Sequence, residues 1–390
     1  MFSSRVSSDL TPNRLASALA RLRQARVEID DLTESNPTSV GLDYPPRLLD
    51  ALAAPAGLAY LPQPFGLPAA RDAVVADFRR RGLAVARDRV VLTASTSEAY
   101  SLLFKLLCNP GDEVLVPSPS YPLFEYLAAL DAVQVRPYHL EYDGAWAIDL
   151  DGLRRATDER TRAIIVVNPN NPTGSYLKRP ELDALAAHCR AHGLALIGDE
   201  VFFEYPLDAD LSRTGSVLAQ REALTFGLGG LSKSLGLPQL KLGWMAVGGP
   251  DDLARPALER LELICDTYLS VATPVQVALP ALLADGSAIR KQIRDRVTRN
   301  YRALFAMAPR YPSIRILPSE GGWYAVLQVP AMQSEESLAL QLLEQDHVLA
   351  HPGYFFDFPR EAFLIVSLLP APEVFDRAMG RLLARAEGPA

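Results

Sequence analysis

The chain has 390 residues, a formal net charge of −7 and a pI near 5.4. This acidic balance provides no basic surface for nucleic acid or for anionic membranes. No apolar run reaches the roughly 18 residues that a membrane span needs. The three cysteines are widely spaced, which predicts no disulfide. Two of the five histidines lie close together in sequence, but no further ligands lie near them, so no metal site is expected. The N-terminus lacks the basic-then-apolar pattern of a signal peptide, which predicts a cytoplasmic location.

The N-terminal part of the chain is expected to form short helices separated by proline-rich turns. Residues 11–27 are predicted to be a helix capped by Thr11, because a hydroxyl residue followed by proline commonly begins a helix. A short extended run at 28–33 follows. Two further helices are predicted at 47–54 and 68–81.

From residue 89 onward, short β-branched runs alternate with amphipathic helical stretches. Apolar strands separated by helices are typical of a mainly parallel sheet covered on both faces. We therefore predict an α/β fold whose large domain has a mainly parallel seven-stranded sheet covered by helices. The strands are expected at 90–94, 113–117, 133–138, 163–168, 195–199, 223–228 and 242–247, with intervening helices including 98–107, 121–130 and 180–191.

The last third of the chain predicts two long helical stretches, one at 250–283 with a break near Thr273-Pro274 and one at 287–307. The short strands and helices after them suit a small α+β domain. At this length two domains are the expectation. We predict a large cofactor-binding domain of residues 45–285 and a small domain built from both termini, residues 1–44 and 286–390.

Polar side chains follow the predicted strands at the ends where open α/β sheets bind ligands. Ser95, Thr96 and Ser97 precede a helix, so they could hold an anion such as phosphate, or simply cap the helix. Tyr121, held between prolines, could stack on a heteroaromatic ring or belong to the core. The Asn-Pro-Asn-Asn-Pro-Thr-Gly run at 168–174 could bind a ligand oxygen or form a plain turn.

Two charged residues end the next strands. Asp199 directly follows a buried strand, so its carboxylate needs a donor or a cation, for which a protonated pyridine nitrogen would serve. Lys233 lies between Ser232 and Ser234 in a Gly-rich loop and is one of only five lysines in an arginine-rich chain. Arginine cannot form an imine, whereas a lysine with a lowered pKa can. A solvated loop residue is the commoner role of such a lysine, but Lys233 is our candidate carrier of an aldehyde cofactor.

Three motifs occur in a recognisable order: NPNNPTG at 168–174, DEV at 199–201 and SKSLGLP at 232–238. Together they resemble the class I/II aminotransferases, which are pyridoxal-phosphate enzymes of fold type I. The resemblance covers nearly the whole chain. It implies transfer of an amino group from an amino acid or amine to an oxo acid, through an aldimine on Lys233 and a pyridoxamine intermediate. It also implies a homodimer with shared active sites.

The resemblance assigns a role to each candidate residue. Lys233 is expected to form the Schiff base and carry the proton, Asp199 to pair with the pyridinium N–H, and Tyr121 to stack on the ring. Asn171 is expected to donate to the ring's phenolate oxygen, and Tyr60 to reach the phosphate of the neighbouring subunit's cofactor. The other expected cofactor contacts are Ser95, Thr96, Ser97, Ser232 and Lys241.

Three positions around the cofactor depart from the family pattern. Phe202 replaces a tyrosine whose hydroxyl holds the phenolate, so the pKa of the Schiff base should rise. Lys241 replaces a phosphate-binding arginine and can supply charge without the two-pronged geometry of a guanidinium. Gly230 stands where a phosphate-binding serine is usual.

A fourth departure concerns the substrate. Ile365 stands where the family has the arginine that clamps the substrate's α-carboxylate. Such a contact contributes about 1.5–3 kcal/mol, so its loss predicts weak or unusual dependence on an α-carboxylate. Arg360, Arg14 and Arg21 are the candidate replacements.

The leading interpretation is therefore an aminotransferase with a small-molecule amino donor and oxo acceptor, whose pocket includes Tyr121, Trp323 and Tyr324. A lyase, decarboxylase or oxidase with the same cofactor is the alternative. A ligand-sensing module of a regulator is a third, although no basic helix-turn-helix stretch precedes residue 30.

Overall fold

The computed structural model describes residues 2–207 and 212–388. Its largest sheet has eight strands in the order β2-β9-β8-β7-β6-β3-β4-β5. The five strands from β8 to β4 are mutually parallel, whereas β9 and β5 run antiparallel to their neighbours. The strands are β2 (Val90–Thr93), β3 (Glu113–Ser118), β4 (Gln134–Tyr142), β5 (Trp146–Ile148), β6 (Thr161–Val167), β7 (Ala195–Asp199), β8 (Thr225–Gly230) and β9 (Gly243–Gly248).

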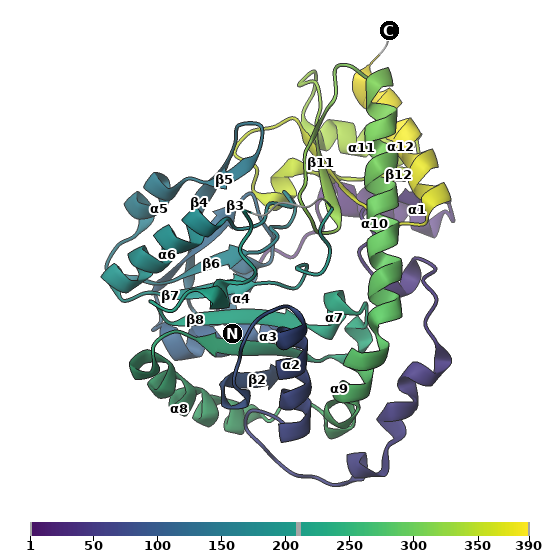
Figure 1. The fold of residues 1–390 in the computed structure, drawn as a ribbon. Helices are drawn as coiled ribbons and strands as arrows, with labels where there is room; N and C mark the ends of the chain where they lie inside the picture. Colours follow the sequence, from purple (N-terminus) through teal and green to yellow (C-terminus); the bar gives the residue numbers. More distant parts are fainter. Residues whose placement is uncertain (1, 208–211, 389–390) are drawn as a thin grey trace.

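Helices cover both faces of this sheet because successive apolar residues of each strand point to opposite sides. Ile165 and Ile197 pack in one buried cluster, which includes residues of α3, α4 and α8, while their neighbours Ile164 and Leu196 pack in another, which includes residues of α6. Figure 1 shows the sheet between these layers. The helices around the sheet are α2 (Pro68–Arg80), α3 (Thr96–Leu107), α4 (Phe124–Leu130), α5 (Leu150–Ala156), α6 (Arg179–His192), α8 (Asp251–Tyr268) and α9 (Thr273–Asp285).

All seven predicted strands are present, and the α/β prediction is confirmed. The eighth strand, β5, was not predicted. It pairs with the end of β4 across the turn at Asp143 and Gly144. Three residues are too few to show a two-residue period, so the sequence pattern carries no strand signal there.

Two predictions for the N-terminal part were wrong in detail. The first helix, α1 (Arg14–Gln24), begins after Asn13, whose side chain accepts a hydrogen bond from the backbone N–H of Ala16 at 2.8 Å. Asn13 rather than Thr11 is therefore the N-cap. The second predicted helix is a 3₁₀ segment, Pro46–Ala53, and not an α-helix. Pro45 precedes the segment and Pro46 is its first residue, and neither has a backbone N–H to donate.

The two ends of the chain meet in a smaller layer. The short strands β1 and β12 pair in parallel, and four more form an antiparallel sheet in the order β10-β11-β14-β13. Figure 1 shows α10 as one long rod reaching up to α11 and α12, beside the purple α1. The bounds are β1 (Asp30–Asp31), α10 (Ser287–Met307), β10 (Arg315–Leu317), β11 (Tyr324–Gln328), α11 (Glu335–Gln345), β12 (Val348–Leu349), β13 (His351–Pro352), β14 (Phe363–Ser367) and α12 (Pro372–Glu387).

This arrangement is the one expected of a small α+β domain from both termini, and the boundaries 45–285, 1–44 and 286–390 remain a prediction. None of the helices in the described part of the chain combines the length and the apolar character that a membrane span needs.

Candidate active site

A cavity of about 270 Å³ lies at the C-terminal ends of the parallel strands. Nine of the ten candidate residues line it, although they are scattered over 147 positions of the sequence. This is where a parallel sheet brings the loops after its strands together. The nine are Ser95, Thr96, Ser97, Tyr121, Asn171, Asp199, Ser232, Lys233 and Lys241.

Asp199 ends β7 and is almost completely buried. Its Oδ1 accepts a hydrogen bond from the backbone N–H of Val201 at 3.2 Å, and its Oδ2 accepts one from the Tyr100 hydroxyl at 3.1 Å. Burial raises the pKa of Asp199 to about 6, while the two hydrogen bonds oppose that rise. The carboxylate is thus held in the cavity by donors yet still favours a further cationic partner.

Lys233 lies in α7 (Leu231–Ser234), the single turn that follows β8. Its backbone carbonyl accepts a hydrogen bond from the Tyr205 hydroxyl at 2.5 Å, which anchors the turn. Its Nζ lies 5.0 Å from the centre of the Trp323 ring and 5.6 Å from that of Phe202. Burial lowers the pKa of Lys233 to about 8, and the charge of Asp199 opposes this shift. A lowered pKa increases the fraction of neutral amine, the form that attacks a carbonyl.

The first turn of α3 forms one end of the cavity. Ser95 is the N-cap of this helix, because its Oγ accepts a hydrogen bond from the backbone N–H of Glu98 at 3.1 Å. The capping interpretation therefore holds, and it leaves the N-terminus of a 12-residue helix directed at the cavity, a favourable place for an anion. Lys241 lines the same cavity and has a left-handed backbone conformation, with φ +47°.

Asn171 and Tyr121 line the cavity beside Asp199. Asn171 is buried, and its Oδ1 has no hydrogen-bond partner among the described residues. A buried amide whose hydrogen bonds are incomplete is costly, so this side chain fits a site that a ligand completes. Burial raises the pKa of Tyr121 to about 12, and the charge of Asp199 adds to the shift. The ring of Tyr121 is therefore a neutral surface beside the carboxylate.

Two of the departures from the family pattern have a structural context. Phe202 is buried with its ring centre 5.2 Å from that of Trp323, so an apolar edge replaces the expected hydroxyl. At Gly230, a Cβ atom would lie 3.0 Å from the Cα of Gly243 on the neighbouring strand β9. A serine at 230 would have to push the two strands apart, because their backbones approach closely there.

The arginine position of β14 is apolar and buried. Ile365 pairs with Val326 of β11, two residues from Tyr324, so the three side chains share the sheet face on which Tyr324 lines the cavity. No arginine is among the described residues that line this cavity.

The three candidate replacements lie elsewhere. Arg14 and Arg21 form ion pairs with Glu336 and Glu344 and are mostly exposed. Arg360 lines a separate surface cavity and stacks on the ring of Phe363.

Of the remaining predicted residues, Tyr324 lines the cavity, while Trp323 is fully buried next to Lys233. Trp323 does not line the cavity, and Tyr60 is the one of the ten cofactor-site candidates that does not line it. It is 72% exposed, on the proline-rich segment before α2.

Tyr100 and Ser35 line the cavity but were not predicted. Tyr100 had one signal in the sequence: it lies four residues after Thr96, on the same face of a helix. That spacing does not show which strand the face meets. Ser35 had no signal beyond its neighbourhood to Asn36-Pro37.

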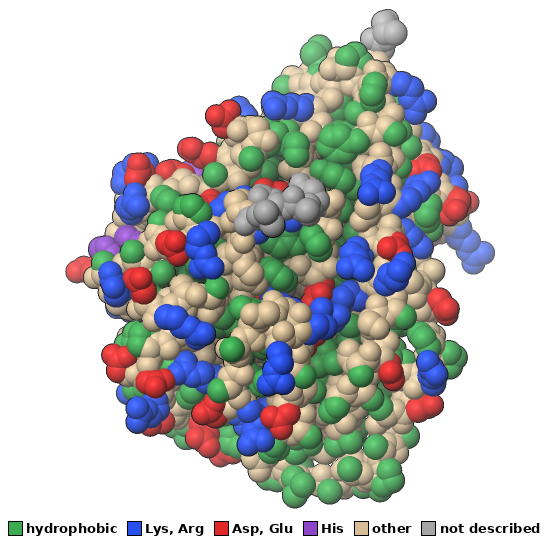
Figure 2. Space-filling model, viewed as in Figure 1, with side chains coloured by type: hydrophobic (Ala, Val, Ile, Leu, Met, Phe, Trp, Pro, Cys, Tyr) green, Lys and Arg blue, Asp and Glu red, His purple; other side chains and the backbone are tan. Residues whose placement is uncertain are grey.

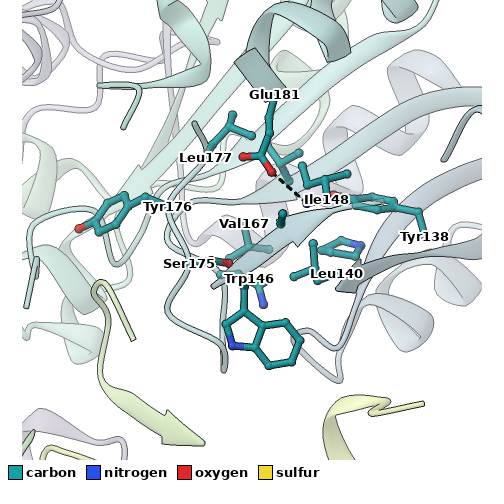
Figure 3. Close-up of a pocket in the computed structure, with 13 residues that line it drawn as sticks. Tyr138, Leu140, Trp146, Ile148, Val167, Ser175, Tyr176, Leu177 and Glu181 are labelled. Atoms are coloured by element: carbon teal, nitrogen blue, oxygen red, sulfur yellow. Dashed lines mark hydrogen bonds between the residues drawn. The ribbon is translucent and has the colours of Figure 1, made fainter. Parts of the chain in front are cut away.

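A second cavity lies between β4, β5 and the start of α6. Figure 3 shows Trp146, Tyr138 and Glu181 around it, with Glu181 accepting a hydrogen bond from the backbone N–H of Ile148 at 2.9 Å. Its volume of about 20 Å³ is room for about one water molecule. It is therefore too small for a substrate.

The larger cavity fits pyridoxal phosphate in its donor set. It is lined by a helix N-terminus and Lys241 for an anion, by the ring of Tyr121, by the amide of Asn171 and by the buried carboxylate of Asp199. Lys233 supplies the amine for an imine. This combination of an anion site, a buried acid and a shifted lysine is what an aldehyde cofactor with a pyridine nitrogen needs.

Comparisons with known proteins identify the family of this chain. The family model for aminotransferase class I and II matches residues 31–382. The glutamate-pyruvate aminotransferase AlaA of Haemophilus influenzae is 27% identical over 371 residues, which cover 93% of this chain and 91% of that protein. The structure of the alanine aminotransferase of Pyrococcus furiosus has a TM-score of 0.89 at 25% identity, with 98% and 99% of the two chains covered. That of an Escherichia coli aminotransferase has a TM-score of 0.88 at 25% identity, covering 100% and 98%.

The match of the family model extends over most of the chain, and the relative and the two solved structures named above are aminotransferases. Enzymes of this family are generally dependent on pyridoxal phosphate. The protein therefore belongs to the class I and II aminotransferases and is an amino-group transferase.

Proposed function

We propose that this aminotransferase binds pyridoxal 5′-phosphate through an imine to Lys233. The observation that carries the proposal is that the buried Asp199 and the partly buried Lys233 line one cavity, each with its pKa shifted toward the neutral form. The bound cofactor supplies an electron sink for removal of a proton from the substrate carbon next to the amine. Asp199 holds a proton at the ring nitrogen, and the Lys233 amine moves the proton at the substrate carbon.

The other lining residues hold the cofactor in place. The first turn of α3, Ser232 and Lys241 bind the phosphate, because a helix N-terminus and an ammonium both favour a doubly charged anion. Tyr121 covers one face of the ring. Asn171 donates its amide N–H to the phenolate oxygen.

For the substrates, we propose an amino acid or amine as donor and an oxo acid as acceptor. Two of the similar proteins bear the names glutamate-pyruvate aminotransferase and alanine aminotransferase, which makes alanine, glutamate and their oxo acids the first compounds to test. The absence of arginine among the described lining residues argues for weak dependence on the donor's α-carboxylate.

We further propose that two copies of the chain form the working enzyme, with Tyr60 of each reaching the phosphate site of the other. Tyr60 lies on a segment with several exposed apolar side chains: Leu49 is 48%, Leu58 91% and Leu61 62% exposed. Figure 2 shows hydrophobic side chains along the lower edge, where Figure 1 draws this segment. An exposed apolar surface of this kind is typical of an interface.

We expect a cytoplasmic enzyme. The three cysteines Cys108, Cys189 and Cys265 are free thiols and at least two are buried, in keeping with a reducing compartment.

The decisive experiment is reduction of the cofactor-loaded protein with borohydride. The wild-type protein should be yellow and should retain about one cofactor per chain after denaturation, because reduction converts the imine to a stable amine. Lys233→Ala should retain none, whereas Lys291→Ala, which changes an exposed lysine, should behave as wild type. Trapping that survives in Lys233→Ala would refute the assignment. Ammonia release from an amino donor without any oxo acid would instead indicate the lyase alternative.

A further inference from the structure

Tyr100 and Asp199 form a buried contact between two elements that are 99 residues apart in sequence. The Tyr100 hydroxyl donates to Oδ2 of Asp199 at 3.1 Å. Tyr100 is 1% exposed and Asp199 is 7% exposed, and both line the cavity. A carboxylate in such surroundings depends on each donor that it receives.

The same helix that carries Tyr100 forms the anion end of the cavity. Thr96, in the first turn of α3, lines that end, and Tyr100 follows it by one turn on the same face. One rigid element therefore reaches both the anion end and the carboxylate. This links the position of Asp199 to that of the phosphate site.

The environment of Tyr100 keeps its hydroxyl protonated, so that it acts as a hydrogen-bond donor to Asp199. Its ring packs edge-on against Phe124, with centroids 5.4 Å apart, and against Phe104 at 6.1 Å. Burial raises the pKa of Tyr100 well above 10, and the charge of Asp199 adds to the rise. The hydroxyl proton therefore stays on the tyrosine. A phenylalanine would fill the same apolar space, so packing alone does not require the hydroxyl.

A carboxylate has about four lone-pair positions. In Asp199, Oδ1 accepts from the Val201 N–H and Oδ2 from Tyr100, and positions for a third donor remain. Because each oxygen already accepts one hydrogen bond, the carboxylate is oriented before a ligand binds.

We propose that Tyr100 is a positioning residue that keeps Asp199 ionised and oriented toward the ring nitrogen of the cofactor. This inference rests on the proposed function, because it concerns the partner of the pyridine nitrogen. It makes part of the cofactor's binding free energy depend on the Tyr100 hydroxyl, through the hydrogen bond that this hydroxyl donates to Asp199.

The other ionisable groups near Asp199 are Lys233, Glu200 and Tyr121. Glu200 faces away, toward Arg81 and Ser216, and Tyr121 stays neutral. Removing the Tyr100 hydroxyl should therefore act mainly on Asp199. Loss of a donor to the charged form raises the pKa of a carboxyl.

The test is Tyr100→Phe in the full-length protein without cofactor, titrated with two compounds. One is pyridoxal phosphate, and the other is its analogue in which a C–H group replaces the pyridine nitrogen. The variant should bind pyridoxal phosphate about tenfold or more weakly, the usual effect of losing a hydrogen bond to a charged group. It should bind the analogue as wild type does, since the analogue makes no bond to Asp199.

A pH series provides the second readout. A protonated Asp199 must lose its proton before it can pair with a pyridinium, so affinity falls as the pH drops below the pKa of Asp199. In Tyr100→Phe this acid limb should move to higher pH by about one unit. Tyr138→Phe is the matched control, because Tyr138 is equally buried and donates to the carbonyl of Ile165 at 2.9 Å, outside the site.

The possible outcomes distinguish a failure of the proposed cofactor from a failure of the proposed role of Tyr100. A wild-type protein that binds neither compound would refute the proposed cofactor. Suppose instead that the wild-type protein binds pyridoxal phosphate. The role of Tyr100 alone would then be refuted if Tyr100→Phe weakened the binding of both compounds equally, or if it weakened the binding of neither. The urea midpoint of the cofactor-free variant, expected within the range of Tyr138→Phe, shows that any loss is not a folding defect.

Discussion

Asp199 is a buried carboxyl group whose charge has no cationic partner at hydrogen-bond distance among the described residues. Its carboxylate is ready to pair with a cation, and burial without that cation raises its pKa to about 6. In the absence of cofactor, the buried charge of Asp199 therefore lowers the free energy of unfolding.

Replacing Asp199 with asparagine should stabilise the cofactor-free protein. A carboxyl whose folded pKa lies above its unfolded value of 3.8 loses stability as the pH rises from about 4 to 6, and the loss persists above pH 6. Asparagine has no charge to bury, so at pH 8 the free energy of unfolding should rise by about 1–3 kcal/mol. At pH 4 the difference should vanish.

The measurement is urea unfolding of the cofactor-free proteins at both pH values. Asp183→Asn, at an exposed side chain, should change little at either pH. The same Asp199→Asn variant should bind pyridoxal phosphate more weakly. If Asp199→Asn is no more stable than wild type at pH 8, burial of the Asp199 charge does not lower the free energy of unfolding.

At the scale of elements, the turn that carries Lys233 depends on a close approach to other parts of the chain. Gly236 has φ +63°, and a Cβ there would lie 2.9 Å from the Tyr44 hydroxyl oxygen and 3.0 Å from Cδ1 of Ile293. The Tyr44 hydroxyl also donates to the carbonyl of Gly236 at 2.6 Å. The segment between α7 and Lys241 is thus packed against residues from both ends of the chain.

Gly236→Ala should therefore destabilise the protein more than Gly82→Ala. Both glycines have positive φ, which costs about 1–2 kcal/mol for other residues. Only Gly236 also has close neighbours, which adds about 1–3 kcal/mol of overpacking. Equal urea midpoints for the two variants would show that the packing around Gly236 is not what holds the turn.

The second element is β14, whose Ile365 lies on the sheet face next to Tyr324. Because no arginine is among the described lining residues, L-alanine and L-alaninol, which differ in the carboxylate, should have kcat/KM values within about tenfold of each other. Single-turnover conversion of the loaded enzyme by each donor measures this ratio. A preference for L-alanine above about a hundredfold would indicate that a cation from elsewhere, such as a second subunit, binds the carboxylate.

At the scale of the whole molecule, Tyr60 does not line the cavity that contains Lys233 of the same chain. An experiment with mixed subunits can therefore test whether Tyr60 serves the active site of the neighbouring subunit. Lys233→Ala and Tyr60→Phe should each have reduced activity. Mixing the two after mild unfolding and refolding should restore activity, because a mixed dimer has one site with both Lys233 and Tyr60 intact. Refolding of each variant alone is the control. If Tyr60 served its own subunit, the mixture would gain nothing.

Much of the fold follows from local sequence patterns. The helix predicted at 287–307 is the observed α10, and all seven long strands lie within a few residues of their predicted positions. Apolar periodicity over such lengths reports burial on one or both faces, which is a local property of the chain. The strand β5 and the cap of α1 escaped prediction because one or two residues decide them.

The candidate site was predicted from polar residues that follow the strands and from three motifs, each of which combines residues adjacent in sequence. The sequence therefore determined which side chains follow the strands: the hydroxyls at 95–97, Asn171, Asp199 and Lys233. Only the tertiary structure decided that Tyr100 meets Asp199, that Trp323 lies under Lys233 and that Arg14, Arg21 and Arg360 point elsewhere. The physical reason is that such contacts depend on the order of strands and the packing of distant elements, which no local period encodes.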